Sequence, residues 1–292
     1  IINIMKKKFL VTGGAGFVGS HLCQKLLDNG HEVYSLDNYF TGSKSNHIDG
    51  VSYIKGETIE ISKLVKFSPD VIFHLGEYSR VEQSFEDIDI VWKYNRYPIT
   101  EIINFCLKND TKLIYSGSST KFGDDGIGKN MSPYAYSKSS NTDLIKNYSD
   151  WFGLKYAITY FYNVYGSREI STGKYSTLIA RYRNRMLKGL PLEVVLPGIQ
   201  RRNFTSIEDI ISGLYCIQEH AEGDGFGIGA DESHSVAEVA AMFGGEIINI
   251  PERKGNRIDA PILNEKLKKL GWMPTRKLKD YINDLKKNNW QG

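Results

Sequence analysis

The chain has 292 residues, of which 41% are hydrophobic and 24% charged, and its formal net charge is +3. This composition excludes a disordered chain, and so small a net charge gives no reason to expect nucleic acid or an anionic membrane as a partner. Cys23, Cys106 and Cys216 are too far apart in the sequence for a metal site or a disulfide framework, and no apolar run approaches the ~20 residues of a membrane span. We therefore expect a cytoplasmic protein that binds no metal.

The first half of the chain alternates between two patterns. Short apolar runs bounded by turn residues, typical of buried strands, occupy residues 9–12, 33–36, 71–75, 112–115 and 156–161. Helical spacing of apolar residues occupies 20–29, 88–107 and 135–152. Alternating strands and helices predict crossover connections around a parallel sheet, which is a doubly wound α/β fold of the Rossmann type.

The second half of the chain is organised differently. Glycine and proline interrupt it after about Gly166, and the remaining helical patterns lie at 204–217, 236–243, 264–270 and 278–285. We expect a dinucleotide-binding domain over residues 1–165, with a returning segment at about 203–225. Residues 166–202 and 226–292 are expected to form a smaller C-terminal substrate-binding lobe over the carboxyl ends of the strands, where open α/β sheets bind ligands.

A glycine-rich loop follows the first expected strand. Gly13, Gly14, Gly16 and Gly19 satisfy both G-x-G-x-x-G and G-x-x-G-x-x-G. Glycine permits the tight turn and the close approach of a pyrophosphate to the backbone, and the N-terminus of the next helix favours the phosphates. The second strand ends in Asp37, whose carboxylate suits a ribose diol and repels a 2′-phosphate, so the pattern predicts NAD rather than NADP.

A tyrosine and a lysine lie one helical turn apart near the start of the helix expected at 135–152. Tyr134 is the only tyrosine of the chain with a lysine four residues later, at Lys138. Side chains at this spacing share a helix face, and a nearby ammonium favours the phenolate that can act as a base. The pair follows a strand that ends near Ser118, so all three polar side chains are expected at one edge of the sheet.

Further motifs occur in order along almost the whole chain. They are Leu36-Asp37-Asn38 with Thr41-Gly42, Phe73-His74-Leu75, Asn95, Phe122-Gly123, Ser132-Pro133-Tyr134 with Lys138, Tyr162-Asn163-Val164-Tyr165-Gly166, Arg202-Asn203-Phe204, Ile207-Glu208-Asp209 and Leu270-Gly271-Trp272. In these motifs the chain resembles the extended short-chain dehydrogenases/reductases that modify nucleotide sugars.

The resemblance implies a role for each catalytic residue. Tyr134 would take the proton from a sugar hydroxyl, usually at C4, while NAD accepts the hydride. Lys138 would favour the phenolate and bind the nicotinamide ribose, and Ser118 would hydrogen-bond the same sugar oxygen.

The resemblance also implies two sets of binding residues. NAD would be held by Gly13, Gly16, Phe17, Val18, Gly19, Asp37, Asn38, Gly42, Glu57, Thr58, Leu75, Gly76 and Asn95, together with Tyr134 and Lys138. A nucleoside-diphosphate sugar would be held by Arg80, Ser119, Asn163, Arg202, Arg253 and Ala260. Ala260 is seven residues after Arg253, at the position that limits sugar size in 4-epimerases of this family, so we expect room for an N-acetylamino sugar or a heptose.

Three departures from the family pattern change the expectations. Glu57 stands where an aspartate usually caps the adenine. Glu77 and Arg80 are unusual charges beside the expected nicotinamide and sugar, and either contact the substrate or pair with each other. Ser119 follows Ser118 where 4,6-dehydratases have a carboxylate pair that eliminates water, so we do not expect dehydratase chemistry.

The sequence leaves three functions open. The first is a 4-epimerase that returns the hydride to the other face of the ketone, and the second is a 4-dehydrogenase that releases a 4-keto sugar, for example a heptose. The third is a non-catalytic NAD-binding regulatory protein. A homodimer paired through the helices near 86–107 and 135–152 is expected in each case. Apolar side chains that the sheet contact could leave for such an interface are Val91, Trp92, Ile99, Ile103, Leu144, Tyr148 and Trp151.

Overall fold

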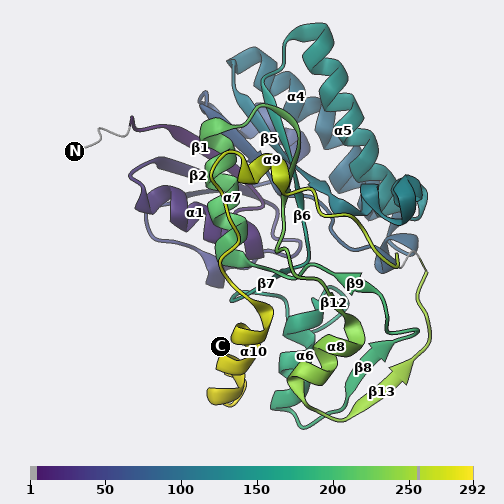
Figure 1. The fold of residues 1–292 in the computed structure, drawn as a ribbon. Helices are drawn as coiled ribbons and strands as arrows, with labels where there is room; N and C mark the ends of the chain where they lie inside the picture. The colour runs from purple at the N-terminus through teal and green to yellow at the C-terminus, as the bar shows by residue number, and fades with distance from the viewer. Residues whose placement is uncertain (1–4, 255–256, 292) are drawn as a thin grey trace.

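A computed structural model describes residues 5–254 and 257–291 of the chain (Figure 1). Its main sheet has seven parallel strands in the order β11-β6-β5-β4-β1-β2-β3. The strands are β1 Lys8–Thr12, β2 Glu32–Asp37, β3 Ser52–Lys55, β4 Val71–His74, β5 Lys112–Ser118, β6 Tyr156–Phe161 and β11 Gly223–Ile228. The strand order reverses beside β1, so this is the Rossmann-type sheet that the alternating patterns predict.

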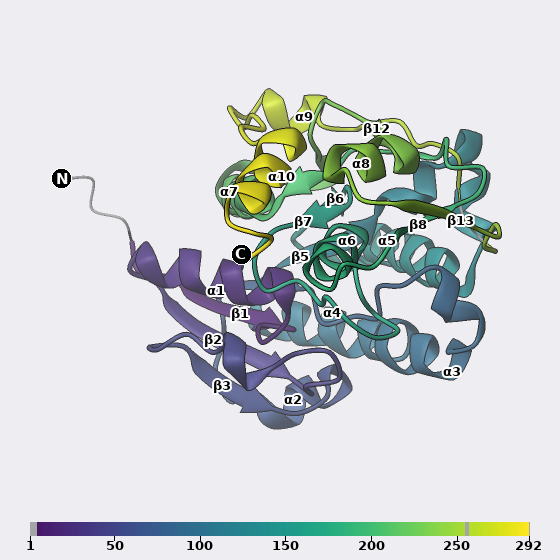
Figure 2. The same cartoon turned by 90° about the horizontal axis from the view of Figure 1, so that it is seen from below.

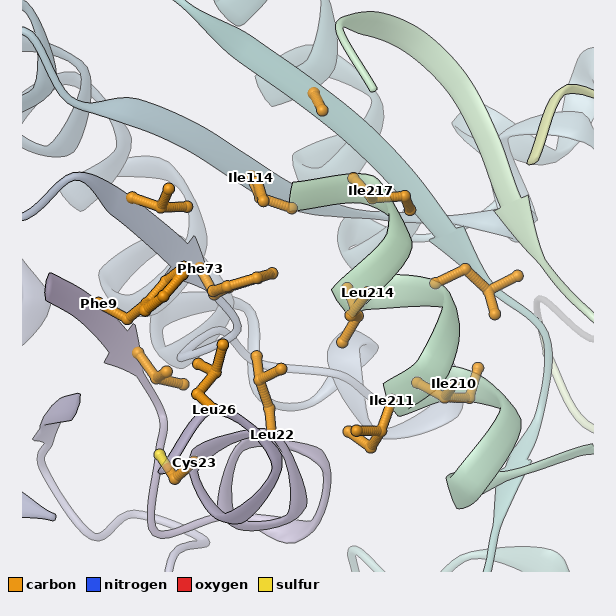
Figure 3. Close-up of a cluster of buried hydrophobic side chains, with 14 of the residues drawn as sticks. Phe9, Leu22, Cys23, Leu26, Phe73, Ile114, Ile210, Ile211, Leu214 and Ile217 are labelled. Atoms are coloured by element: carbon orange, nitrogen blue, oxygen red, sulfur yellow. The ribbon is translucent and has the colours of Figure 1, made fainter. Parts of the chain in front are cut away.

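Helices cover both faces of this sheet. Alternate residues of β1 point to opposite faces, so Phe9 and Leu10 belong to different hydrophobic clusters. On the Phe9 face pack α1 Phe17–Asp28 and α7 Ile207–His220, and Figure 3 shows leucine and isoleucine side chains of both helices in one cluster with Phe9, Phe73 and Ile114. The Leu10 face is covered by α4 Pro98–Asn109 and α5 Pro133–Phe152.

The helix expected over 88–107 is interrupted. A short helix, α3 Ile88–Val91, continues into a π-helical turn at Trp92–Arg96, and α4 starts again at Pro98. Proline has no N–H to donate within a helix, and it fits at the first helical position. Val91, Ile99 and Ile103 are buried inside the chain itself. These three side chains therefore do not form the exposed dimer surface that we expected of them.

The lobe, which lies below the sheet in Figure 1, has a hydrophobic cluster of its own. The lobe contains the helices α6 Leu178–Leu187, α8 Val236–Phe243 and α10 Leu278–Lys287, and the parallel strands β8 Leu192–Val195 and β13 Ile247–Ile250. Two further short strand pairs lie outside the main sheet. They are β7 Val164–Tyr165 with β10 Thr205–Ser206, and β9 Arg201–Arg202 with β12 His234–Ser235. Seen from below in Figure 2, these segments lie over the ends of the central strands.

The chain passes between the two parts more often than its sequence suggests. The expected boundary at residue 225 falls within β11, because the glycine-rich sequence of this strand gives a weak strand signal. Near the C-terminus, α9 Glu265–Lys268 packs on β11 and α7. Trp272 joins the cluster between the sheet and α7, and its indole Nε1 donates to the carbonyl of Asp209 at 3.1 Å. In the part of the chain that the structure describes, no helix has the length and apolar character needed to cross a membrane.

Candidate active site

A cleft of about 570 Å³ lies at the carboxyl ends of the strands, between the sheet and the lobe. It is lined by the loop after β1, the ends of β4 and β5, the start of α5 and segments of the lobe. The expected site residues in its lining are Gly13, Gly16, Phe17, Val18, Gly19, Asp37, Asn38, Gly42, Thr58, Leu75, Gly76, Arg80, Ser118, Ser119, Tyr134, Lys138, Asn163, Arg202 and Arg253. Folding thus brings together residues that are up to 240 positions apart in the sequence.

The glycine loop forms a tightly packed cradle of backbone at the start of α1. Gly13 has a φ of +75°, and a Cβ there would lie 2.8 Å from the Cα of Gly76. A Cβ on Gly19 would lie 2.1 Å from the carbonyl oxygen of Gly13. Only glycine fits both positions, because the backbone of the loop packs this closely on itself and on Gly76, and α1 begins directly after the loop at Phe17. The cradle therefore fits a pyrophosphate.

Asp37 marks one end of the cleft. Its carboxylate accepts hydrogen bonds from the backbone N–H groups of Ala15 at 2.9 Å and Tyr39 at 2.7 Å. Burial raises the pKa of Asp37, although these two N–H groups oppose the shift. A Cβ on Gly42 would come within 3.0 Å of the carboxylate, so glycine keeps the space beside Asp37 open. This end fits the adenosine ribose of a dinucleotide.

Three of the expected binding residues do not line the cleft. Glu57 forms an ion pair with Lys93 at 2.7 Å. Asn95 is fully buried, and its side-chain amide bonds the backbone N–H and C=O of Tyr78, which ties down the segment after β4. Ala260 is buried outside the lining, so the expected gap in the sugar pocket is not at this residue.

Three expected catalytic residues meet in the lining beyond β5. Ser118 is the last residue of β5, and its hydroxyl lies 2.8 Å from the hydroxyl of Thr120. The hydroxyl of Ser132 accepts the N–H of Ala135 at 3.0 Å and caps α5. This cap and the proline at the first helical position start the helix so that Tyr134 and Lys138 lie on its first two turns, and both side chains face the cleft.

Beside these residues lies a buried carboxylate. The side chain of Glu77 is 1% exposed and forms an ion pair with the Lys138 ammonium, which also donates to the carbonyl of Ser116 at 2.6 Å. The Tyr115 hydroxyl donates to Glu77 Oε2 at 2.9 Å, and Asn141 Nδ2 donates to Oε1 at 3.1 Å. Both oxygens of Glu77 therefore have partners, and Lys138 is held in one position.

The charges around Glu77 keep it ionised. Burial alone would raise the pKa of Glu77, but Lys138 and His74 together lower it below the ordinary value. His74 lies with Nε2 3.3 Å from Glu77 and Nδ1 2.7 Å from the Thr12 hydroxyl. One of our two interpretations was that Glu77 and Arg80 pair with each other. This is wrong, because Glu77 pairs with Lys138. The partner of Glu77 is 61 residues away in sequence, on α5, where no local pattern indicates it.

The lobe side of the cleft is basic. Arg80 donates through Nε to the carbonyl of Tyr175 at 2.9 Å, and Arg253 pairs with Glu82 at 2.7 Å. Arg202 donates to the carbonyls of Arg201 at 2.7 Å and Arg257 at 2.8 Å. Arg257 also lines the cleft, and sequence reasoning missed it because we counted from Arg253 to Ala260 and passed over the residues between them.

The comparisons with known proteins agree with this geometry. The profile described as "NAD dependent epimerase/dehydratase family" matches residues 9–229. The chain belongs to this family. It is accordingly an NAD-dependent enzyme, and the glycine cradle and Asp37 fit this cofactor.

Individual relatives cover almost the whole chain. The UDP-N-acetyl-alpha-D-glucosaminuronate decarboxylase of Bacillus cytotoxicus is 32% identical, in an alignment that covers 81% of this chain and 79% of that protein. The putative UDP-glucose 4-epimerase of Methanocaldococcus jannaschii is 28% identical, over 96% of this chain and 99% of that protein. The crystal structure of the Thermus thermophilus UDP-glucose 4-epimerase in complex with NAD matches with a TM-score of 0.87 and 26% identity, over 98% and 99% of the two chains.

We expect Asp37→Ala to weaken NAD binding by about tenfold to a hundredfold, because the ribose hydroxyls lose the buried carboxylate that would accept their hydrogen bonds. NADP binding falls less, since the same change removes the charge that repels a 2′-phosphate. Quenching of protein fluorescence by each dinucleotide measures both affinities, with Asp49→Ala, at an exposed carboxylate outside the cleft, as the control. Tighter binding of NADP than NAD by the unmutated protein would contradict the assignment of Asp37.

Proposed function

We propose that this enzyme oxidises C4 of a nucleoside-diphosphate sugar to the 4-keto sugar and then returns the hydride to the other face, as a 4-epimerase. The observation that supports this most is the meeting of Ser118, Tyr134 and Lys138 in one cleft with the glycine cradle. The cleft continues past these residues to the arginines of the lobe. A nucleotide sugar needs such a site, with a base at the sugar and cations at the diphosphate.

The proton chemistry is assigned to Tyr134. Its phenolate accepts the proton of the C4 hydroxyl, and the Ser118 hydroxyl hydrogen-bonds the same oxygen as it becomes a carbonyl. Lys138 lies one helical turn after Tyr134 on the same face of α5. Glu77 and the carbonyl of Ser116 hold the Lys138 ammonium in place. Bound NAD supplies the hydride acceptor.

The return of the hydride decides the product. A 4-epimerase must let the keto sugar rotate in the pocket, so that its other face meets the hydride, while Asn163, Arg202 and Arg253 hold the diphosphate. Glu77 is kept ionised by Lys138 and His74, so it has no proton to donate. The position after Ser118 holds Ser119, which lacks the carboxylate that elimination of water needs. We therefore propose an epimerase rather than a dehydratase.

Product analysis tests this proposal. We expect the purified enzyme to convert at least one member of a panel of nucleotide sugars to its 4-epimer, which NMR identifies without a change in mass. Bound NADH, followed by its absorbance, should not accumulate at steady state. A product two mass units lighter would instead show net 4-dehydrogenation, and a product 18 units lighter would show dehydration. No turnover of any member would favour a regulatory NAD-binding protein.

We also infer a homodimer formed through α4 and α5. Large apolar side chains remain exposed at the end of α5, where Trp151 is 61% and Phe152 is 62% exposed, and just before α4, where Tyr97 is 59% exposed. Such surfaces are commonly covered by a second copy. Light scattering at micromolar concentration should give twice the chain mass, and Trp151→Glu should shift it toward the monomer. Met273→Glu, an equally exposed site near the C-terminus, should leave the mass unchanged. A monomeric unmutated protein would exclude this interface.

A further inference from the structure

Arg257 lines the cleft, and the proposed mechanism does not use it. Arg257 is only 7% exposed, and its Nη2 donates to the Ser119 hydroxyl at 3.2 Å. Nη1 is buried, and no atom of residues 5–254 and 257–291 accepts a hydrogen bond from it. One arm of a buried guanidinium is therefore left without a partner, which costs free energy unless a ligand supplies one.

The nearest carboxylates do not meet this need. Asp124 and Asp259 attract Arg257 only electrostatically. Asp124 accepts the backbone N–H of Ile258 at 3.2 Å, and Asp259 accepts the N–H of Ala260 at 2.8 Å. Both acids thus stabilise the turn of the backbone. Burial lowers the pKa of Arg257, as expected for a cation that lacks a close counter-ion.

Arg257 differs in this respect from two other arginines of the lining. Three nitrogens of Arg80 donate to the carbonyls of Tyr175 and Ser79. Arg253 pairs with Glu82. Arg257 is the one whose hydrogen-bonding capacity points to a ligand.

The position of Arg257 is at the reacting end of the cleft. Its partner Ser119 follows Ser118, and its charge interacts with Tyr134. The loop after β5 makes room for the side chain, because a Cβ on Gly123 would lie 2.9 Å from the Cδ of Arg257. A ligand group at Nη1 would therefore belong to the sugar and not to the adenosine end, which Asp37 marks.

We propose that the sugar of the substrate carries a carboxylate and that Arg257 binds it. A guanidinium presents its N–H groups in a fork that matches the two oxygens of a carboxylate, and such charged pairs are the stronger hydrogen bonds. Ser119 orients the guanidinium, and the free Nη1 donates to the sugar. The inference rests on the proposed function, because it assumes a nucleotide sugar in this cleft.

Calorimetry with matched ligands tests the inference without turnover. The Tyr134→Phe protein with NAD is titrated with UDP-glucose and UDP-glucuronate, and with GDP-mannose and GDP-mannuronate, pairs that differ only in a hydroxymethyl group or a carboxylate at C6. We expect the acid of at least one pair to bind about tenfold to a hundredfold more tightly than its neutral partner. Arg257→Gln should bring this ratio close to one, and Arg257→Lys should keep part of it.

Two further variants separate this role from a general loss of binding. Arg253→Gln should weaken the acid and the neutral sugar by the same factor and so keep the ratio. Gly123→Ala should lower the ratio, because the added methyl group displaces Arg257. Equal affinities for acid and neutral sugar in the Tyr134→Phe protein, or an unchanged ratio in the Arg257→Gln variant, overturn the inference.

The same ligands distinguish this failure from that of the proposed function. Epimerisation of the neutral sugar without a preference for the acid leaves the 4-epimerase standing and removes the carboxylate. If an acidic sugar binds through Arg257 but the unmutated enzyme never oxidises it or any other sugar at C4, the carboxylate site stands and the 4-epimerase proposal fails.

Discussion

Tyr134→Phe is expected to lower the rate of hydride transfer by ~10²–10⁴, the usual contribution of a positioned acid or base. The hydroxyl is the only group removed, and the ring stays in place on the first turn of α5, so folding and NAD binding should be close to those of the unmutated enzyme. Single-turnover reduction of bound NAD by the nucleotide sugar, followed by its absorbance, isolates this step from product release.

Tyr136→Phe is the matched control for this experiment. Tyr136 lies two residues later on the same helix but is 49% exposed, and its ring stacks on Trp92 at 6.2 Å between centroids. Removing its hydroxyl should leave hydride transfer unchanged. Nearly full activity of the Tyr134→Phe enzyme would mean that another group takes the proton.

Glu77→Gln is expected to destabilise the fold by about 3–5 kcal/mol, because it leaves the buried Lys138 ammonium without its counter-charge. Urea unfolding of the unmutated protein and of the Glu77→Gln variant measures the difference in the free energy of unfolding. The control is Glu57→Gln, which breaks the 2.7 Å ion pair with the half-exposed Lys93. There solvent screens the charges, and the loss should be about 0–1 kcal/mol.

Two further measurements identify the cause of this loss. Adding Lys138→Met to Glu77→Gln should recover part of the stability, since the double variant no longer buries an unpaired charge. An additive effect of the two substitutions would argue against the pair. The pH dependence has a defined sign, because the pKa of Glu77 is lower in the folded protein than its ordinary value of 4.5.

For a carboxyl group with a lowered pKa, the stabilisation is present above the unfolded value and is lost as pH falls through the folded value. The stability gap between the unmutated protein and Glu77→Gln should therefore be constant from pH 7 to about pH 5. It should then narrow below pH 4.5. A gap that widens toward acid pH would show that Glu77 is not held as a carboxylate.

The local signals of the sequence predicted much of this molecule. Glycine spacing identified the cradle at Gly13, Gly16 and Gly19, because the turn needs residues without side chains at these positions. The i, i+4 spacing placed Tyr134 and Lys138 on one face of α5. Each signal acts within a few residues, so no tertiary contact is needed to interpret it.

Signals of intermediate range were less reliable. The strands β3 and β11 were not predicted, because one is half exposed and the other is rich in glycine. The long helix expected over 88–107 was divided by a π-helical turn before Pro98. In each case the strand or helix depends on a neighbour that packs against it or on a backbone group that the pattern of apolar residues does not report.

The sequence by itself determined the Rossmann-type fold, the cofactor loop and the candidate base, since these follow from backbone conformation and local spacing. Only the tertiary structure decided that Glu77 neutralises Lys138 and that Arg257, not Ala260, faces the cleft. A charge on a sequence carries no information about its partner when that partner is 61 residues away. The partner is set by which segments pack together, because burial makes an unpaired charge costly and so selects the arrangement that pairs it.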